Sequence, residues 1–549
     1  MKTHISITFW TLCALLTATV CQAQHLTFAD TLRGALRPER QCFDVTFYDL
    51  DIELFPEKKS IAGTVSMHYI GQLASDTIQV DLARTMQLSM VTQQGKVLGF
   101  RRVEDAVFIG LDQPTCFGES GNLVMTYEGE PEAAENPPWD GGFTWKTDSL
   151  GRVWAGVSCE GIGASIWWPN KDHLSDEPDS VNVSLTVPDP LRAISNGQFR
   201  GSERLSSGRT RYSYATTYPI NNYNVTFYLG HYLSFQDTLY DVRKGEPLEL
   251  HYSVLDYNLD RAKRHFEQVK PMLRCFGDVL GPYPFWKDGY RLIEAPYLGM
   301  EHQSAIAYGN NYMRGYRGGM IPPDMNWDYL IVHESGHEYF GNALSVTDHG
   351  EMWIHESFTT YLEALYVECR FGRADYDRYL LGQRGFIKNA KPIMGLPHVN
   401  FDDFGSSDHY FKGSWVLHTW RSVIGDEQFF QFLKGFYEAY AIGSVTTADF
   451  FNYVANNTQV EATELNPTIF WQQYLYQPTI PVLHVEQKST GETIAYFSDV
   501  LPGFQLPLTV NGKRIVVSDR VAAYPISEKA WKTFYAPNYL IKFESQLGQ

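Results

Sequence analysis

Two histidines and a glutamate in one short segment have the spacing of a metal site. The segment from Trp327 to Asn342 reads WDYLIVHESGHEYFGN, a pattern that predicts a helix and contains His333, Glu334 and His337. Residues four positions apart lie on the same face of a helix, so both imidazoles can reach one metal ion. Glu334 follows His333 and points beside the metal, where a carboxylate can act as a general base. The pattern H-E-x-x-H therefore indicates zinc-dependent hydrolysis.

A third ligand for the same ion stands in a second helix-like stretch, residues 351–365, which reads EMWIHESFTTYLEAL. Eighteen residues, 338–355, separate His337 from Glu356. Structural zinc sites are closed by four protein ligands, whereas catalytic sites use three and keep one position for water, whose pKa falls to about 7. We therefore expect one catalytic zinc ion per chain, held by His333, His337 and Glu356.

Chance and the other histidines offer alternatives to this interpretation. In a chain with 16 histidines, H-E-x-x-H alone arises by chance in roughly a few per cent of sequences, and the requirement for Glu356 lowers that figure. His302, His355 and His409 lie near these motifs, but none has the spacing of a ligand. We therefore expect them to be packed or surface residues.

The spacing of H-E-x-x-H, eighteen residues and Glu resembles the aminopeptidase-N family of gluzincins, which includes the leukotriene-type epoxide hydrolases. Three further segments agree, in family order, within residues 41–476. Residues 298–302, LGMEH, resemble the family's G-x-M-E-N strand, with Leu298 and His302 in place of its Gly and Asn. Residues 410–413, YFKG, resemble the Y-x-K-G motif, and residues 159–161, CEG, resemble a β-domain segment that carries Gln or Glu at the second position.

This resemblance implies roles for residues outside the metal site. Tyr410 is expected to face the metal across the substrate and to stabilise the oxyanion that forms when water attacks the carbonyl. Gly299 is expected to bind the substrate through the backbone of its strand, and Met300 to line the pocket for the first side chain. Glu160 and Glu301 are expected to bind the free ammonium group of a peptide. The resemblance thus implies an aminopeptidase whose substrates are peptides with a free N-terminus.

The elements that must position these residues indicate a multidomain α+β protein. From about residue 41 to 254, short runs alternate apolar and polar residues between turn formers, as antiparallel strands do. Helical spacing follows, and after residue 477 strand-like alternation returns, with a turn signal at Asn511-Gly512. We predict an N-terminal β domain at 24–254, a catalytic domain at 255–476 and a small C-terminal β domain at 477–549. The resemblance implies that the catalytic domain is thermolysin-like and mainly helical.

The first residues of the chain predict export. The apolar stretch from Ile5 to Val20 is shorter than the roughly 20 residues of a spanning helix, and Ala23 supplies the small residue before a cleavage site. We expect residues 1–23 to be a signal peptide, and the mature protein to be periplasmic or extracellular, with no membrane insertion. Lipid attachment at Cys21 is disfavoured because the preceding valine is bulkier than the small residue such sites favour.

Charge and cysteine content argue against several classes of protein. The formal net charge is −18 and no basic run occurs, whereas nucleic acids and anionic membranes are bound through clustered Lys and Arg. Of seven cysteines, five follow the predicted cleavage site, at wide spacings and without a C-x-x-C pair. Neither a disulfide framework nor a cysteine metal site is therefore indicated. An odd number also leaves at least one thiol without a partner in the same chain.

Three other functions could use the same residues. A family member that retains the fold without the activity would be a binding module, against which the complete catalytic set argues. A zinc endopeptidase would share the metal site but not the two amine-binding carboxylates. An epoxide hydrolase of lipid substrates would also share the metal site, but that activity is exceptional within the family. We therefore expect a secreted zinc aminopeptidase with Glu334 as its general base.

Overall fold

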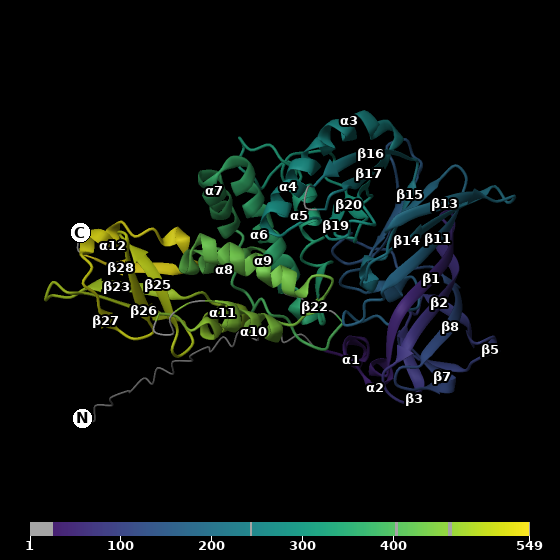
Figure 1. Ribbon diagram of the computed structural model, residues 1–549, viewed down its shortest axis with the longest axis horizontal. Helices are drawn as coiled ribbons and strands as arrows, with labels where there is room; N and C mark the ends of the chain where they lie inside the picture. Colours follow the sequence, from purple (N-terminus) through teal and green to yellow (C-terminus); the bar gives the residue numbers. More distant parts are fainter. Residues whose placement is uncertain (1–25, 242–243, 401–404, 459, 461–463, 548–549) are drawn as a thin grey trace, which may run out of the picture.

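The computed structural model of the protein describes residues 26–241, 244–400, 405–458, 460 and 464–547. The predicted signal peptide and its cleavage near Ala23 lie outside the described residues. Three parts follow one another along an elongated molecule: a β-rich part at one end, a mainly helical part in the middle and a small β-rich part at the other end (Figure 1). The predicted multidomain α+β fold is confirmed.

The N-terminal part begins with two short helices, α1 (Phe28–Gly34) and α2 (Pro38–Gln41), and continues as three sheets. The largest sheet has eight strands, in the order β13 (Gln198–Arg204), β14 (Arg209–Ala215), β11 (Ser180–Pro188), β1 (Phe43–Phe55), β2 (Ser60–Gly71), β8 (Ser120–Gly129), β4 (Met86–Gln93) and β5 (Lys96–Val97). A four-stranded sheet has the order β12 (Arg192–Ser195), β15 (Phe227–Gly230), β10 (Val153–Ser158) and β9 (Gly142–Thr147). A three-stranded sheet has the order β3 (Ser75–Asp81), β7 (Ala106–Thr115) and β6 (Phe100–Val103).

The alternation of apolar and polar residues gives these sheets a buried face. Strand β1 pairs antiparallel with β2 and parallel with β11. From Tyr48 to Leu54 every second side chain of β1 is buried, as expected for a strand with one face on a core. The same core contains the adjacent side chains of Trp167 and Trp168. These two lie shortly after the segment that holds Glu160, so the core anchors that segment.

A five-stranded sheet joins the N-terminal part to the helical part. Its order is β16 (Tyr232–Tyr240), β17 (Pro247–Leu255), β18 (Tyr290–Glu294), β20 (Ile306–Tyr308) and β19 (Gly299–Met300). Alternate residues of β18 face two cores: Leu292 packs with the helices, and Ile293 packs with the N-terminal sheets. The predicted boundary after residue 254 falls inside this sheet, because β16 and β17 have the same alternating pattern as the strands before them.

The middle part consists mainly of helices. They are α3 (Leu259–His265), α4 (Val269–Val279), α5 (Tyr329–Gly336), α6 (Trp353–Phe371), α7 (Arg373–Arg384), α8 (Asp408–Ile424), α9 (Asp426–Tyr440), α10 (Thr447–Asn457) and α11 (Pro467–Tyr476). Two short strands, β21 (Leu344–Val346) and β22 (Gly443–Val445), form a parallel pair. Within the residues that the structure describes, no helix is both long and apolar enough to span a bilayer.

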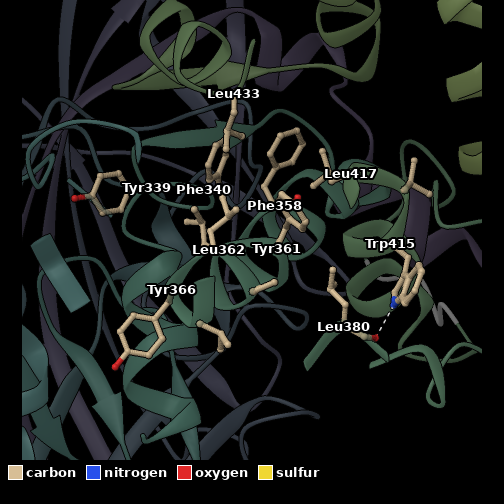
Figure 2. Packing of buried hydrophobic residues seen from close by; sticks show 14 of the residues in the cluster. Tyr339, Phe340, Phe358, Tyr361, Leu362, Tyr366, Leu380, Trp415, Leu417 and Leu433 are labelled. Carbon is tan, nitrogen blue, oxygen red and sulfur yellow. Dashed lines mark hydrogen bonds between the residues drawn. The ribbon is translucent and has the colours of Figure 1, made fainter. Parts of the chain in front are cut away.

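Aromatic and leucine side chains fill the space between these helices (Figure 2). Phe358 of α6 stacks on Phe340, which follows α5, with ring centroids 4.7 Å apart. Trp415 of α8 donates a hydrogen bond from Nε1 to the carbonyl oxygen of Leu380 in α7 (2.9 Å). The first contact fixes α6 relative to the end of α5, and the second fixes α8 relative to α7; the predicted site residues lie on or beside α5, α6 and α8.

The small C-terminal part packs on α8. It contains a sheet in the order β27 (Ala522–Ala523), β24 (Thr493–Ser498), β23 (Val482–Gln487) and β28 (Lys542–Gln546), a hairpin of β25 (Gln505–Val510) and β26 (Lys513–Ser518), and α12 (Glu528–Lys532). Asn511 and Gly512 have φ angles of 48° and 75°, as the central residues of a type I′ turn require. Lys412 of α8 donates to the carbonyl oxygens of Gln477 (2.8 Å) and Pro478 (2.9 Å), where this part begins.

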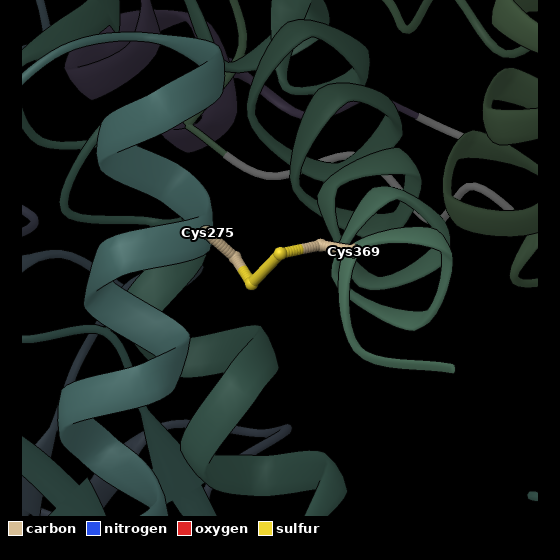
Figure 3. The surroundings of a disulfide bond; sticks show 2 residues. All are labelled: Cys275 and Cys369. Atoms are coloured by element: carbon tan, nitrogen blue, oxygen red, sulfur yellow. A yellow bond between two sulfur atoms is a disulfide. The ribbon is translucent and has the colours of Figure 1, made fainter. Parts of the chain in front are cut away.

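A disulfide bond connects Cys275 of α4 with Cys369 of α6 (Figure 3). The sequence did not indicate this bond, because the two cysteines are 94 residues apart and share no local pattern. The thiols of Cys42, Cys116 and Cys159 are free. The bond ties α4 to the C-terminal end of α6, the helix that carries the predicted ligand Glu356.

Candidate metal and catalytic site

Helix α5 carries the predicted base and is followed directly by a predicted ligand. All of its residues are buried, and its N-terminus is capped by Asp328, which accepts a hydrogen bond from the backbone N–H of Leu330 (3.0 Å). The helix is shorter than the predicted range of 327–342. It ends at Gly336, with His337 as its C-cap, because the chain turns back at Gly341, whose φ is 132°.

The predicted ligands His333, His337 and Glu356 converge on one point between α5 and α6. The Nε2 atoms of the two histidines are 3.2 Å apart, and Glu356 Oε2 lies 3.6 Å from His333 Nε2 and 3.4 Å from His337 Nε2. Zinc–ligand bonds of about 2.0–2.1 Å in a tetrahedral arrangement place the ligand atoms about 3.3 Å apart. The three atoms therefore have the spacing of ligands to a single zinc ion.

The hydrogen bonds of both imidazoles favour a cation at this point. His337 Nδ1 lies 3.0 Å from the carbonyl oxygen of Phe340, which can only accept, so Nδ1 carries a proton. His333 Nδ1 lies 2.6 Å from the carboxylate of Glu363. In the neutral rings, both Nε2 lone pairs then face the buried Oε2 atom of Glu356, which has no hydrogen-bond partner among the described residues. Three acceptors without a donor fit a bound metal ion.

The charges around His333 also favour a cation. Burial by itself lowers the pKa of this imidazole, but the neighbouring carboxylates of Glu356 and Glu363 raise the pKa well above its usual value. Carboxylates that stabilise a proton here stabilise any positive charge in the same place. The residues present therefore fit a divalent metal ion.

Glu363 supports the metal site, and the sequence analysis did not identify it. Its Oε1 atom contacts His333, while Oε2 accepts hydrogen bonds from the hydroxyl of Tyr379 (2.6 Å) and from Gln383 Nε2 (3.3 Å). Such a carboxylate fixes the tautomer and the orientation of a metal-binding imidazole. Glu363 lies two helical turns after Glu356, on the same face of α6, and this spacing is the signal that could have identified it.

We expect Glu363→Gln to weaken zinc binding by about 10- to 100-fold, because the amide keeps the shape of the side chain but removes the charge that polarises His333. Competition with a zinc-binding dye measures the affinity directly. Tyr379→Phe removes only one hydrogen bond to Glu363 and should give a smaller loss. Equal zinc affinity in the wild type and in Glu363→Gln would show that Glu363 only fills space.

Glu334 points into the same site and contacts the edge strand β19. A Cβ atom at Gly299 would collide with the Oε1 atom of Glu334 and with the side chain of Leu330, so only glycine lets the strand lie this close to α5. Among the described strands, β19 pairs only with β20. Gly299 and Met300 therefore lie at an open sheet edge beside the predicted base, where an extended peptide can add as a strand.

Glu160 and Glu301 line the same cavity, the first from the loop after β10 and the second directly after β19. Burial and the neighbouring Glu301 raise the pKa of Glu160 well above its usual value. Burial also raises the pKa of Glu301, although His337 opposes this shift. The hydroxyl of Tyr223, from the N-terminal part, donates to Glu301 Oε1 (3.0 Å). Two acids in one cavity, the half-buried Glu160 and the buried Glu301, fit a positively charged ligand.

The loop that carries Glu160 is held from behind by α1. Arg33 of α1 donates from Nη2 to the carbonyl oxygen of Ile162 (2.7 Å) and to Asp172 Oδ2 (2.9 Å). The same Asp172 oxygen accepts hydrogen bonds from the backbone N–H (3.1 Å) and the hydroxyl (2.5 Å) of Ser165. Arg33 and Tyr223 position the two acids from distant parts of the chain, and no local spacing in the sequence could have indicated them.

Tyr410 lies in the first turn of α8, and its ring stacks against that of His333 at a centroid distance of 5.9 Å. Burial and the carboxylates of Glu356 and Glu160 raise its pKa well above the usual value, so the hydroxyl stays protonated and can donate. The helix approaches α6 closely because Gly413 has no side chain: a Cβ atom there would collide with Ser357. The hydroxyl of Ser357 donates to the carbonyl oxygen of His409 (2.7 Å), which fixes the start of the helix.

The site residues that the sequence predicts line one cavity of about 610 Å³. The cavity brings together the predicted metal ligands, base, tyrosine, acid pair and edge strand: His333, His337, Glu356, Glu334, Tyr410, Glu160, Glu301, Gly299 and Met300. Its remaining wall is largely apolar and includes Trp139, Met320, Phe386 and Phe411, which the sequence analysis did not identify. A hydrolytic centre and an apolar side-chain pocket thus share one space.

The histidines that were set aside in the sequence analysis do not belong to the metal cluster. His302 and His355 are buried, and the ring of His302 contacts the hydroxyl of Tyr228 through Nδ1 (2.8 Å). His409 borders the cavity at the start of α8. Within the part of the chain that the structure describes, the one group of side chains placed to bind a metal is His333, His337 and Glu356.

Comparisons with known proteins agree with this site. Residues 264–474 match the peptidase family M1 domain. Aminopeptidase N of Lactobacillus delbrueckii subsp. lactis is 21% identical over 512 residues, which cover 86% of this chain and 56% of the relative. Leukotriene A-4 hydrolase of Xenopus laevis is 23% identical over 313 residues, which cover 54% of this chain and 48% of the relative. The chain thus spans about half the length of these relatives.

Solved structures share the fold. The crystal structure of an M1 zinc metallopeptidase from Deinococcus radiodurans superposes with a TM-score of 0.66 at 20% identity, over 80% of this chain and 95% of that one. A mutant of the Deinococcus enzyme was solved with a Tyr-Ser-Ala substrate, and it superposes with a TM-score of 0.65 at 21% identity over 80% of this chain and 96% of that one.

Proposed function

We propose that this chain, which belongs to the aminopeptidase-N-like gluzincins and carries a peptidase family M1 domain, is a zinc aminopeptidase that removes single residues from the N-termini of peptides. One observation carries the proposal: a three-ligand metal site and the carboxylates of Glu160 and Glu301 line the same cavity. The metal site accounts for hydrolysis. The acid pair restricts it to substrates that bring a positive charge, as a free N-terminus does.

The residues of the site divide the reaction between them. His333, His337 and Glu356 would hold the zinc ion, which polarises carbonyl groups and acidifies water when bound. Glu334 takes a proton from the attacking water and returns it to the leaving amine nitrogen. Burial raises the pKa of Glu334 to about 8 against the opposing effect of the neighbouring imidazoles of His333 and His337. Tyr410 donates its hydroxyl proton in a hydrogen bond to the developing oxyanion.

The substrate's backbone and ammonium group are held by other elements. The open edge of β19 binds the peptide backbone, and Glu160 and Glu301 bind the ammonium group. The apolar wall, with Met300 and Trp139, accommodates the first side chain. The Tyr-Ser-Ala complex of the Deinococcus neighbour supports a peptide as the substrate class for this chain.

A comparison of free and acetylated substrates tests the proposal. We expect leucyl or alanyl amides to be hydrolysed at least about 100-fold faster than their N-acetylated counterparts, because a blocked amine leaves both carboxylates without a partner in a buried site. Release of the fluorogenic leaving group measures both rates. Glu301→Gln should slow hydrolysis of the free substrates and so reduce the ratio of the free to the acetylated rate, while zinc content stays unchanged.

The same assay separates the alternatives. Equal cleavage of free and acetylated substrates would identify an endopeptidase that uses the same metal site. A preparation that folds without zinc, and whose stability and ligand binding do not respond to added zinc or to a chelator, would instead favour a binding module. Turnover of lipid epoxides without amide hydrolysis would identify the epoxide hydrolase.

We also propose that the protein works outside the cytoplasm. The apolar stretch from Ile5 to Val20 followed by Ala23 supports export. The disulfide between Cys275 and Cys369 supports it independently, because disulfides persist in oxidising compartments and are rare in the cytosol. Periplasmic or secreted protein should start at Gln24, which N-terminal sequencing of the mature chain tests.

A further inference from the structure

A second cavity, of about 620 Å³, lies between the N-terminal part and the five-stranded sheet. Residues of β12, β13 and β14 form one wall, and residues of β16, β17 and β18 form the other. This cavity shares no lining residue with the cavity of the metal site. It is as large as the candidate active site, and the reaction proposed above does not use it.

A buried arginine on β18 faces this cavity without a carboxylate partner. Arg291 is only 5% exposed, and its Nη1 atom donates to the carbonyl oxygens of Ser195 (2.9 Å) and Gly197 (2.8 Å). Among the described residues, no carboxylate oxygen lies within ion-pair distance of it, and its Nε and Nη2 atoms have no protein acceptor. Both atoms retain some exposed surface, and Arg291 lines the cavity. A buried guanidinium without an anion in contact is costly, because its desolvation is offset by two neutral carbonyls and by the ring of Tyr214, whose centroid lies 5.6 Å from its Cζ atom.

The other charged groups of the cavity leave a surplus of positive charge. Arg192 and Lys287 line it as well, and neither has a carboxylate partner among the described residues. Two acids, Asp288 and Glu249, also line the cavity. Asp288 accepts hydrogen bonds from the backbone N–H (2.9 Å) and the hydroxyl (2.6 Å) of Thr217, and Glu249 pairs with His251 (3.1 Å). Three cations against two carboxylates leave this cavity one positive charge in excess within a chain of net charge −18, which favours an anionic ligand.

We propose that this cavity binds a small organic anion that carries carboxylate or phosphate groups. The open Nε and Nη2 donors of Arg291 can engage two oxygens of one such group side by side, which a planar guanidinium does better than an ammonium. Arg192 and Lys287 bind a second anionic group from the rim. The rings of Tyr212 and Tyr214, which also line the cavity, pack on the carbon skeleton of the ligand. The bound anion bridges the N-terminal part and the five-stranded sheet.

Titration calorimetry on the zinc-loaded mature chain tests this site, with inorganic phosphate and with succinate at constant ionic strength. We expect saturable binding of at least one anion and a rise in the melting temperature on binding. The double variant Arg192→Gln/Lys287→Gln changes exposed side chains only and should weaken binding by about tenfold or more. Arg291→Lys retains the positive charge but removes the paired N–H donors of the guanidinium, so it should also weaken anion binding. A matched double variant on the exposed hairpin and turn of the C-terminal part, Lys513→Gln/Arg520→Gln, should bind as the wild type does.

The outcomes separate the sources of the ligand. Binding of phosphate alone identifies a phosphate-bearing ligand, and binding of succinate alone identifies a carboxylate-bearing one. The proposal is overturned if neither anion binds saturably, or if both double variants behave alike, since binding would then occur at the metal site or through net charge. The measurement requires no turnover, so its result does not depend on the proposed peptidase activity.

Discussion

Glu334→Gln should lower kcat/KM for a leucyl amide by about 10³- to 10⁴-fold while leaving zinc content unchanged. The amide has the same shape as the carboxylate and fits beside Gly299, but it cannot accept the proton of the attacking water. It also cannot return a proton to the leaving amine. The loss should therefore appear in kcat, with KM changed little, because a general base acts on the attacking water and on the leaving amine during turnover.

The position of Glu334 makes this prediction specific. Glu334→Asp retains an acid but withdraws it by one methylene group, so it should recover only part of the activity. Glu427→Gln, at the exposed start of α9, removes an acid of the same helical part and should leave turnover unchanged. A Glu334→Gln enzyme with more than one tenth of wild-type turnover would refute the assignment of the base.

The metal site could be predicted from the sequence because its ligands are encoded locally. His333 and His337 are one helical turn apart, and the helical pattern around Glu356 places that acid on a second helix. Glu363 belongs to the same kind of pattern and could have been found two turns after Glu356. Packing then brings α5 and α6 together, and this packing depends on side chains such as Phe340 and Phe358 that no motif records.

The rest of the site depends on contacts between distant segments. Tyr223 reaches Glu301 across 78 positions of the chain, and Arg33 reaches Ile162 across 129. The disulfide between Cys275 and Cys369 likewise joins segments that are far apart in the chain, at a separation of 94 positions. No periodicity connects such pairs, so a single sequence carries no sign of them. The boundary predicted after residue 254 falls within the five-stranded sheet for a related reason: alternation of apolar and polar residues predicts a strand but not the strand with which it pairs.

Tyr410→Phe should lower kcat by about 10²- to 10³-fold, the effect of losing one donor to an oxyanion. Phenylalanine retains the stacking on His333, so zinc binding and the position of α8 should persist.

The structure explains why Tyr410→Phe should lower kcat without weakening substrate binding. Gly413 and Ser357 hold α8 against α6 without any contribution from the Tyr410 hydroxyl. Because its hydroxyl remains protonated, it interacts most strongly with the negative charge that exists only in the transition state. KM should therefore stay within about threefold of the wild type while kcat falls. Tyr476→Phe, at the exposed end of α11, controls for loss of a tyrosine hydroxyl elsewhere in the helical part. If Tyr410→Phe raises KM and spares kcat, Tyr410 binds the ground state, and a different group must stabilise the oxyanion.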